Sequence, residues 1–130
     1  MKNIVEAIKK TGVFFIATVD EGQPRVRPFG SVTEYNGKIY ICTNNTKDVF
    51  KQIEKNNKIE ICGMVGEGEW IRVTAEAIRD ADLDAKKAIL EDPTGPSYLY
   101  KYDDPIFEVF YLENPKCIKY SFTSDLVEIK

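Results

Sequence analysis

The chain has 130 residues, of which 43% are apolar and 30% charged, and its formal net charge is −3. This composition is typical of a soluble globular protein, and a chain of this length buries about two-thirds of its unfolded surface, so we expect one domain over residues 1–130. The acidic balance argues against nucleic acid as a partner. No apolar run reaches the ~18 residues that cross a bilayer, and the charged amino-terminal segment does not resemble a secretory signal. We therefore expect a cytoplasmic protein without a membrane partner.

Apolar periodicity and turn residues predict a series of strands with a few helices. In chain order they are a helix at 3–10, strands at 13–19, 25–33 and 38–43, a helix that follows the turn at 44–46 and ends near 55, strands at 58–65 and 69–79, a helix at 82–91, a short helix at 97–102, strand pieces at 107–112 and 116–122 broken at 113–115, and a final strand at 126–129. Asn36-Gly37 is a strong hairpin signal, and Pro28, which lacks an amide hydrogen, restricts its strand to a sheet edge or a bulge. This order predicts a mainly β (α+β) fold built as a small antiparallel barrel.

The residue inventory excludes several chemistries. The chain has no histidine, which excludes histidine general bases, histidine-activated nucleophiles and nearly all histidine-containing zinc sites. Cys42, Cys62 and Cys117 are far apart and form no CxxC motif, so we expect neither a metal site nor a disulfide framework. Redox or hydrolytic chemistry would therefore need another carrier, and a bound organic cofactor is the obvious candidate.

A polar turn at residues 43–47, Thr-Asn-Asn-Thr-Lys, follows a predicted strand and opens a predicted helix. The first amide groups of a helix are unpaired and the helix dipole is positive there, so an anion binds favourably. Thr46 adds a hydroxyl group and Lys47 a mobile cation. The alternative is a plain helix cap with a surface lysine.

Arg25 and Arg27 are separated by one residue on a predicted strand, so their side chains point to the same face. Two such charges repel each other unless an anion or a carboxylate lies between them, and the planar guanidinium group is well suited to phosphate. An exposed strand face is the alternative. If the fold brings Arg27 close to Lys47, the two features form one phosphate site.

Aromatic side chains are a further candidate for ligand or partner contacts. Trp70 is the only tryptophan and begins a strand after a glycine-containing turn, where it packs in the core or an interface or supports a planar ligand. A dense aromatic group near the carboxyl end suits core packing, a dimer interface or a stacking platform: Tyr98, Tyr100, Tyr102, Phe107, Phe110 and Tyr111.

Three segments of the chain form a pattern in their order and spacing. They are residues 17–24 (ATVDEGQP) followed by Arg27, residues 40–44 (YICTN) followed by Lys47 and QIEKN at 52–56, and residues 70–77 (WIRVTAEA). In this order and spacing they resemble the pyridoxamine 5′-phosphate oxidase superfamily. The resemblance covers most of residues 13–80, and the carboxyl-terminal third is similar to a branch of small flavin-binding proteins rather than to the oxidase proper.

The resemblance implies an antiparallel split β-barrel of six to seven strands with a few peripheral helices. It also implies a homodimer that binds one FMN at each of two sites between the subunits. The cofactor contacts that it implies are Arg27 and Lys47, with Thr46 as a weaker contact, around the phosphate, Pro28 and Phe29 along the isoalloxazine ring, Cys42, Thr43 and Asn44 around the ribityl chain and ring, and Trp70 where the oxidase has a glutamine that touches the flavin. The strand alternation adds Arg25 to the expected cofactor contacts.

Departures from the family pattern limit the reaction that we expect. Val32 replaces a lysine of the oxidase, and the Arg-x-His substrate motif is absent, so we do not expect oxidation of pyridoxine phosphate. The histidine associated with nitroimidazole-reductase-like relatives is also missing, and no catalytic residue is assigned. We expect an FMN-dependent oxidoreductase that passes electrons from a reduced nicotinamide to a small acceptor such as a quinone or a nitro compound. The alternatives are a non-enzymatic module that stores or senses a flavin, a deazaflavin or haem, and a purely structural dimer.

Overall fold

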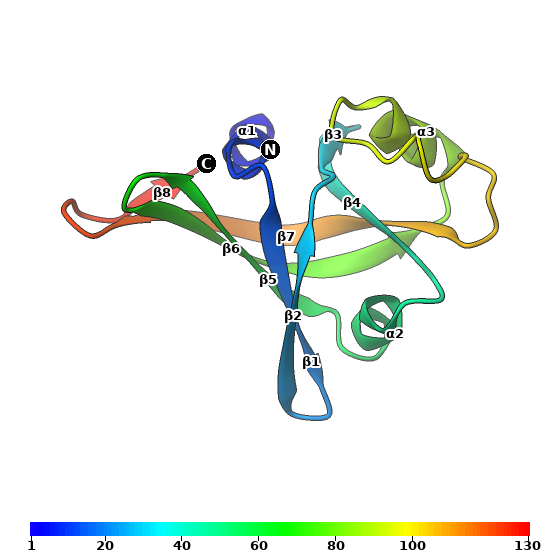
Figure 1. Ribbon diagram of the computed structural model, residues 1–130, viewed down its shortest axis with the longest axis horizontal. Helices are drawn as coiled ribbons and strands as arrows, with labels where there is room; N and C mark the ends of the chain where they lie inside the picture. Colours follow the sequence, from blue (N-terminus) through cyan, green and yellow to red (C-terminus); the bar gives the residue numbers. More distant parts are fainter.

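The computed structural model covers residues 1–130 and shows an eight-stranded antiparallel sheet with three helices (Figure 1). In chain order the elements are α1 (Lys2–Lys10), β1 (Phe14–Asp20), β2 (Gln23–Phe29), β3 (Thr33–Tyr35), β4 (Lys38–Asn44), α2 (Asp48–Lys55), β5 (Lys58–Gly66), β6 (Glu69–Asp80), α3 (Leu83–Glu91), β7 (Phe107–Ser121) and β8 (Val127–Ile129). The strands pair in the order β2-β1-β5-β6-β7-β4-β3, and β8 pairs with β7. This order makes β2 and β3 the two edge strands, and because they do not pair with each other the curled sheet stays open, as in a split barrel.

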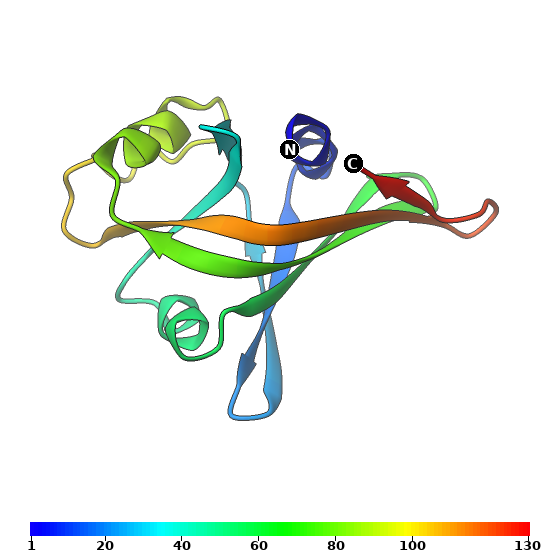
Figure 2. The ribbon, with the colours of Figure 1, turned by 180° about the vertical axis from the view of Figure 1, so that it is seen from behind.

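Strand alternation places the core on the inner face of the curled sheet. In β1, Phe14, Ile16 and Thr18 are buried, whereas Phe15 and Val19 are exposed on the outer face. Figure 2 shows the two longest strands, β6 and β7, crossing the length of the molecule beneath α1. A smaller apolar cluster packs under α3, and none of the three helices has the length and apolar character needed to cross a membrane.

The structure confirms the mainly antiparallel β fold with peripheral helices but contains eight strands rather than six or seven. The expected strand at 25–33 is divided into β2 and β3, because residues 30–32 leave the strand pairing, and Val32 is completely buried. The expected break at 113–115 is a bulge inside a continuous β7, where Asn114 takes a left-handed φ of 53°. The expected short helix at 97–102 is wrong, since only one turn forms, with the amides of Leu99 and Tyr100 donating to the carbonyl of Pro96.

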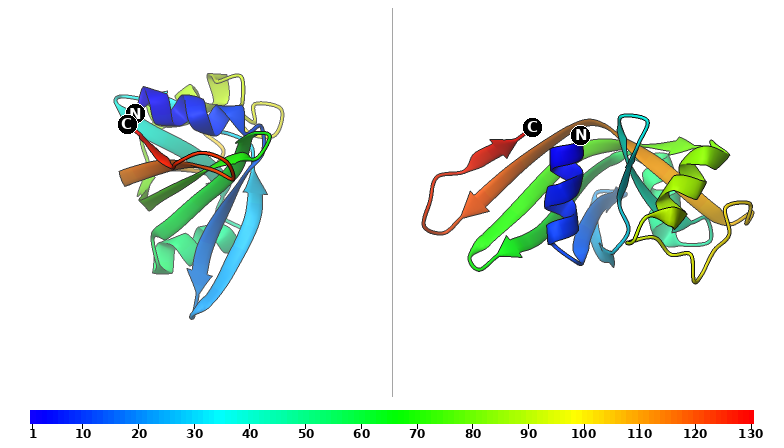
Figure 3. Two further views of the ribbon diagram at one scale, coloured as in Figure 1. Left: turned by 90° about the vertical axis from the view of Figure 1, so that its left-hand side faces the viewer. Right: turned by 90° about the horizontal axis from the view of Figure 1, so that it is seen from above.

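The β1–β2 hairpin extends away from the sheet and lies beside α2 (Figures 1 and 3). Helix α2 buries Val49, Phe50 and Ile53 against the sheet and leaves its charged side chains outside. β2 is an edge strand that pairs only with β1, as predicted from Pro28, which has no amide hydrogen to donate to a second neighbour. A cavity lies between the hairpin and α2.

Asp92 anchors the loop that follows α3. Its carboxylate accepts hydrogen bonds from Lys9 Nζ at 2.7 Å, Thr33 Oγ1 at 2.8 Å, and the Thr94 amide and hydroxyl at 2.9 and 2.8 Å. Burial alone raises the pKa of Asp92, but the hydrogen bonds from Lys9, Thr94 and Thr33 outweigh it and lower the pKa below the usual 3.8. The loop is thereby attached to both α1 and β3.

We expect Asp92→Asn to destabilise the protein by about 2 kcal/mol at pH 7, because the charge-assisted bonds are lost. A carboxylate with a lowered folded pKa stabilises the fold above its unfolded pKa, and this contribution is lost as the pH falls through the folded pKa. The difference between wild type and variant in urea unfolding should thus shrink as the pH falls below about 3.8. A difference that stays constant down to pH ~2 would show that the charge of Asp92 does not matter.

Candidate functional site

Two adjoining cavities lie between the β1–β2 hairpin, α2 and β4. The larger, which we call the outer groove, has a volume of about 1090 Å³ and is lined by residues 19–22, 25–28, 47–49, 51, 52, 55 and 56. The smaller, the inner pocket, has a volume of about 210 Å³ and is lined by residues 27–31, 42, 43, 47, 49, 96, 99 and 100. Both cavities share Arg27, Pro28, Lys47 and Val49. They therefore meet end to end at a pair of cations.

Arg27 is held rigidly at this junction. The strand register pairs Arg27 with Ile16 and Arg25 with Thr18, so both arginines project from the inner face of β2, as predicted. The Arg27 guanidinium donates to Thr18 Oγ1 at 2.8 Å, Gln52 Oε1 at 2.6 Å and the Ile16 carbonyl at 3.2 Å. Desolvation and the neighbouring charge of Arg25 lower its pKa, while Asp48 opposes them. Arginine has five N–H donors, so donors remain for an anion.

The loop between β4 and α2 is ordered by its own side chains. Asn44 Oδ1 accepts from the amide and the hydroxyl of Thr46 at 3.0 and 2.5 Å, and Asn44 Nδ2 donates to Tyr100 Oη at 2.6 Å. Lys47 is the N-cap residue of α2, and no side chain caps the first amides of this helix. The uncapped start of α2 and the exposed Lys47 thus line the same cavities as Arg27, and a helix start with nearby cations binds phosphate favourably.

A buried ion pair supports this loop from behind. Glu108 on β7 is 2% exposed and accepts two hydrogen bonds from Arg79, at 3.0 and 3.1 Å. The same carboxylate accepts a bond of 2.8 Å from Asn45 Nδ2. Because Asn45 lies between Asn44 and Thr46, Glu108 fixes the path of the chain that leads to Lys47.

The inner pocket has a mixed lining. Phe29, Leu99 and Pro96 supply apolar surface, and Thr43 and Ser31 supply hydroxyl groups. Burial raises the pKa of Cys42 to about 12 even though Ser31 and Lys47 lower it, so the thiol is neutral at physiological pH and is not a nucleophile. The pocket can therefore accommodate a planar, partly apolar ring without supplying a general base.

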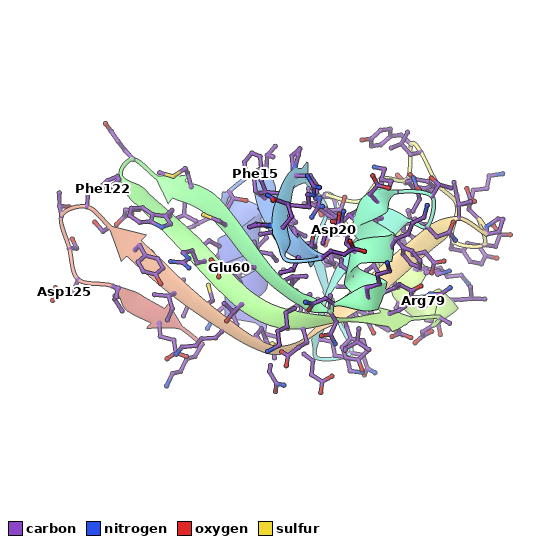
Figure 4. All side chains as sticks on the ribbon, turned by 90° about the horizontal axis from the view of Figure 1, so that it is seen from below. Phe15, Asp20, Glu60, Arg79, Phe122 and Asp125 are labelled. Carbon is purple, nitrogen blue, oxygen red and sulfur yellow. The ribbon has the colours of Figure 1, made fainter.

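The structure brings most of the predicted contacts together and leaves one apart. Seven of them line the two cavities: Arg25, Arg27, Pro28, Phe29, Cys42, Thr43 and Lys47. Asn44 and Thr46 order the adjoining loop. Trp70 lines neither cavity; it stacks on Tyr120 with ring centroids 5.5 Å apart and packs at 4.9 Å from Phe122. Figure 4 shows Phe122 at the far end of the sheet from α2.

Comparison with known proteins assigns the family. A family model described as pyridoxamine 5′-phosphate oxidase matches residues 1–107. The chain belongs to this family. A protein of known structure, a NimC/NimA family protein from Clostridium acetobutylicum, is 43% identical over 99% of this chain and 90% of that chain, with a TM-score of 0.93. No curated protein sequence matches the chain at a significant level.

Two more distant structures share the fold of this pyridoxamine 5′-phosphate oxidase family. A pyridoxamine 5′-phosphate oxidase-related, FMN-binding protein from Nostoc punctiforme is 15% identical over 94% of this chain and 84% of that chain, with a TM-score of 0.68. A haem-binding protein from Mycobacterium smegmatis is 16% identical over 95% of this chain and 55% of that chain, with a TM-score of 0.71. The predicted family and split-barrel fold are thus confirmed.

Several residues that shape the site in this family member were not singled out from the sequence. Thr18 and Gln52 hold Arg27, and the available signal was a polar residue within an apolar strand or helix face. Glu108 likewise interrupts an apolar strand. Leu99 was also not singled out, and it reaches the inner pocket from the loop after α3. Tyr100, which belongs to the aromatic group noted in the sequence, reaches the pocket from the same loop. No local pattern indicates this placement, because the loop is held by distant bonds such as Ser31 Oγ to the Thr94 carbonyl at 2.6 Å.

Proposed function

We propose that the chain binds a flavin through the phosphate group of the flavin and passes electrons from a reduced nicotinamide to a small acceptor. FMN is the smallest flavin that carries such a phosphate. The observation that carries this proposal is the meeting of Arg27 and Lys47 where the cationic outer groove joins the inner pocket. A phosphate at this junction leaves the attached ring system to enter the inner pocket. The FMN-binding relative with the same fold supports the choice of cofactor.

Each lining residue has a physical task in this proposal. Arg27, fixed by three hydrogen bonds, offers a rigid donor fork to the phosphate, and Lys47 adds a mobile charge. Phe29 offers apolar surface to the ring, and the neutral Cys42 thiol and the Thr43 hydroxyl offer weak polar contacts. A bound flavin supplies the hydride and electron transfer. The neutral Cys42 thiol does not act as a base toward a bound substrate.

We further propose that the active form is a homodimer. On the outer face of the sheet, Phe15 is 45% exposed, Val26 67% and Met64 53%, and the Trp70 and Phe122 cluster lies at one end of it. A contiguous apolar surface of this kind is typical of an interface. A second copy is the occupant that brings Trp70 to a flavin, as the family resemblance implies. Three unpaired cysteines fit a reducing compartment, and we propose the cytoplasm.

The test is to titrate the purified protein with FMN and riboflavin, then add NADH or NADPH without oxygen. We expect a yellow complex that prefers FMN to riboflavin, bleaches with the nicotinamide and is reoxidised by a quinone or a nitro compound. Light scattering of the complex should give the mass of two 14.8 kDa chains. Failure to take up either flavin would contradict the proposed function, whereas a bound flavin that no nicotinamide reduces would favour storage or sensing.

A further inference from the structure

The outer groove carries more positive charge than the single phosphate of FMN requires. Besides Arg27 and Lys47 it is lined by Arg25, Lys51 and Lys55. The carboxylates that line it are fewer: Asp20, Glu21 and Asp48. The groove is therefore positive overall, although the chain has a net charge of −3. None of the ion pairs in the protein involves Lys47, Lys51 or Lys55, so their charges are not neutralised within the chain.

The cations form two rows that face each other across the groove. Lys51 and Lys55 lie one helical turn apart on α2, and Lys47 precedes them by another turn, so successive positions are about 6 Å apart along the helix. Opposite them, Arg25 and Arg27 are about 7 Å apart on the same face of β2. Like charges at this helical spacing destabilise a helix, which makes an anionic occupant favourable.

The arrangement of the inner pocket and the outer groove indicates which ligand carries the anionic group. The inner pocket is lined by residues 29–31 of the chain after β2 and by the end of β4, whereas the outer groove extends toward the hairpin turn and the end of α2. Arg27 and Lys47 stand between them. A ligand with its ring in the inner pocket and its first phosphate at Arg27 and Lys47 therefore continues, through that phosphate, into the outer groove.

We propose that Arg25, Lys51 and Lys55 form a second phosphate subsite, which binds the second phosphate of a dinucleotide flavin, FAD. The subsite rests on the proposed flavin function and deepens it, because it names the larger cofactor as the preferred one. The volume of about 1090 Å³ is slightly above the usual range of about 300–1,000 Å³ for ligand sites and leaves room for a nucleoside beyond the phosphates.

The far end of the groove suits the adenosine of this ligand. Asp20 and Glu21 lie at the tip of the β1–β2 hairpin, and Figure 4 shows Asp20 beside α2. Carboxylates accept hydrogen bonds from ribose hydroxyl groups, as they do in other dinucleotide sites. Arg25 Nε lies 3.6 Å from Asp20 Oδ2, which is too long for a hydrogen bond. The guanidinium group can therefore turn toward a phosphate.

The experiment compares FMN, FAD and riboflavin by fluorescence titration of the flavin-free protein at one ionic strength. The test variant is Lys51→Gln with Lys55→Gln, and the matched control is Lys2→Gln with Lys58→Gln, two exposed lysines outside both cavities. We expect wild type to bind FAD about 10-fold more tightly than FMN. The test variant should lose about 10-fold in FAD affinity and less than ~3-fold in FMN affinity, while the control loses neither.

The outcomes separate this inference from the proposed function. FMN binding that exceeds riboflavin binding, together with equal affinities for FMN and FAD, keeps the flavin function and overturns the second subsite. Equal losses of FMN and FAD affinity in the test variant also overturn it, because Lys51 and Lys55 then only raise the overall positive potential of the groove and do not bind a second phosphate. Absence of binding by all three flavins overturns both proposals. Thermal unfolding of each variant checks that the fold is retained.

Discussion

Replacing Arg27 with alanine is expected to weaken FMN binding by about 10- to 150-fold, the equivalent of charge-assisted hydrogen bonds worth about 1.5–3 kcal/mol. Arg27 is already fixed by Thr18, Gln52 and the Ile16 carbonyl, so it loses little side-chain freedom when a phosphate binds. Arg27→Lys should lie between wild type and Arg27→Ala, because it keeps the charge but loses the planar donor fork. Fluorescence titration with FMN measures the affinities.

Riboflavin and a remote lysine provide the controls for Arg27. Riboflavin lacks the phosphate, so its affinity should be nearly the same for wild type and Arg27→Ala. Lys2→Ala removes an exposed charge on α1, far from the groove, and should leave FMN binding unchanged. If Arg27→Ala weakens riboflavin and FMN equally, Arg27 shapes the pocket through Thr18 and Gln52 rather than by binding phosphate.

Features that depend on neighbouring residues could be predicted from the sequence. The shared face of Arg25 and Arg27 follows from strand alternation, and the register with β1 confirms it. Asn36-Gly37 forms the turn between β3 and β4 with φ values of 53° and 74°, which are accessible to these two residue types. The edge position of the strand with Pro28 follows from its missing amide hydrogen.

Features that depend on distant parts of the chain could not be predicted in the same way. A bulge at Asn114 and a break at Asn114 have the same local signals, and only the pairing of β7 with β6 on both sides of the bulge decides for a continuous strand. Tyr100 reaches Asn44 across 56 positions of sequence because the loop after α3 folds back over the inner pocket. The site was thus predictable where residues from one strand or helix form it, and not where loops close over it.

Replacing Arg79 with methionine is expected to destabilise the protein by about 3 kcal/mol and lower its Tm by about 10 °C, because it leaves the buried Glu108 carboxylate with one remaining partner. Glu108 is 2% exposed and accepts two of its three side-chain hydrogen bonds from Arg79. Arg79 itself is half exposed, so the lower end of the usual cost for a broken buried pair applies. Thermal and urea unfolding measure the change.

The double variant Arg79→Met with Glu108→Leu separates the cost of an unpaired charge from the value of the pair. With both charges removed no buried carboxylate is left without its counter-ion, so we expect most of the lost stability to return. FMN affinity should be lower in the double variant than in wild type, because Asn45 has then lost its 2.8 Å bond to Glu108 and the loop that carries Lys47 is less ordered. Equal Tm values for the single and double variants would mean that the unpaired Glu108 carboxylate is not the cause of the lost stability. Recovered stability with the FMN affinity of wild type would mean that Glu108 does not position the loop.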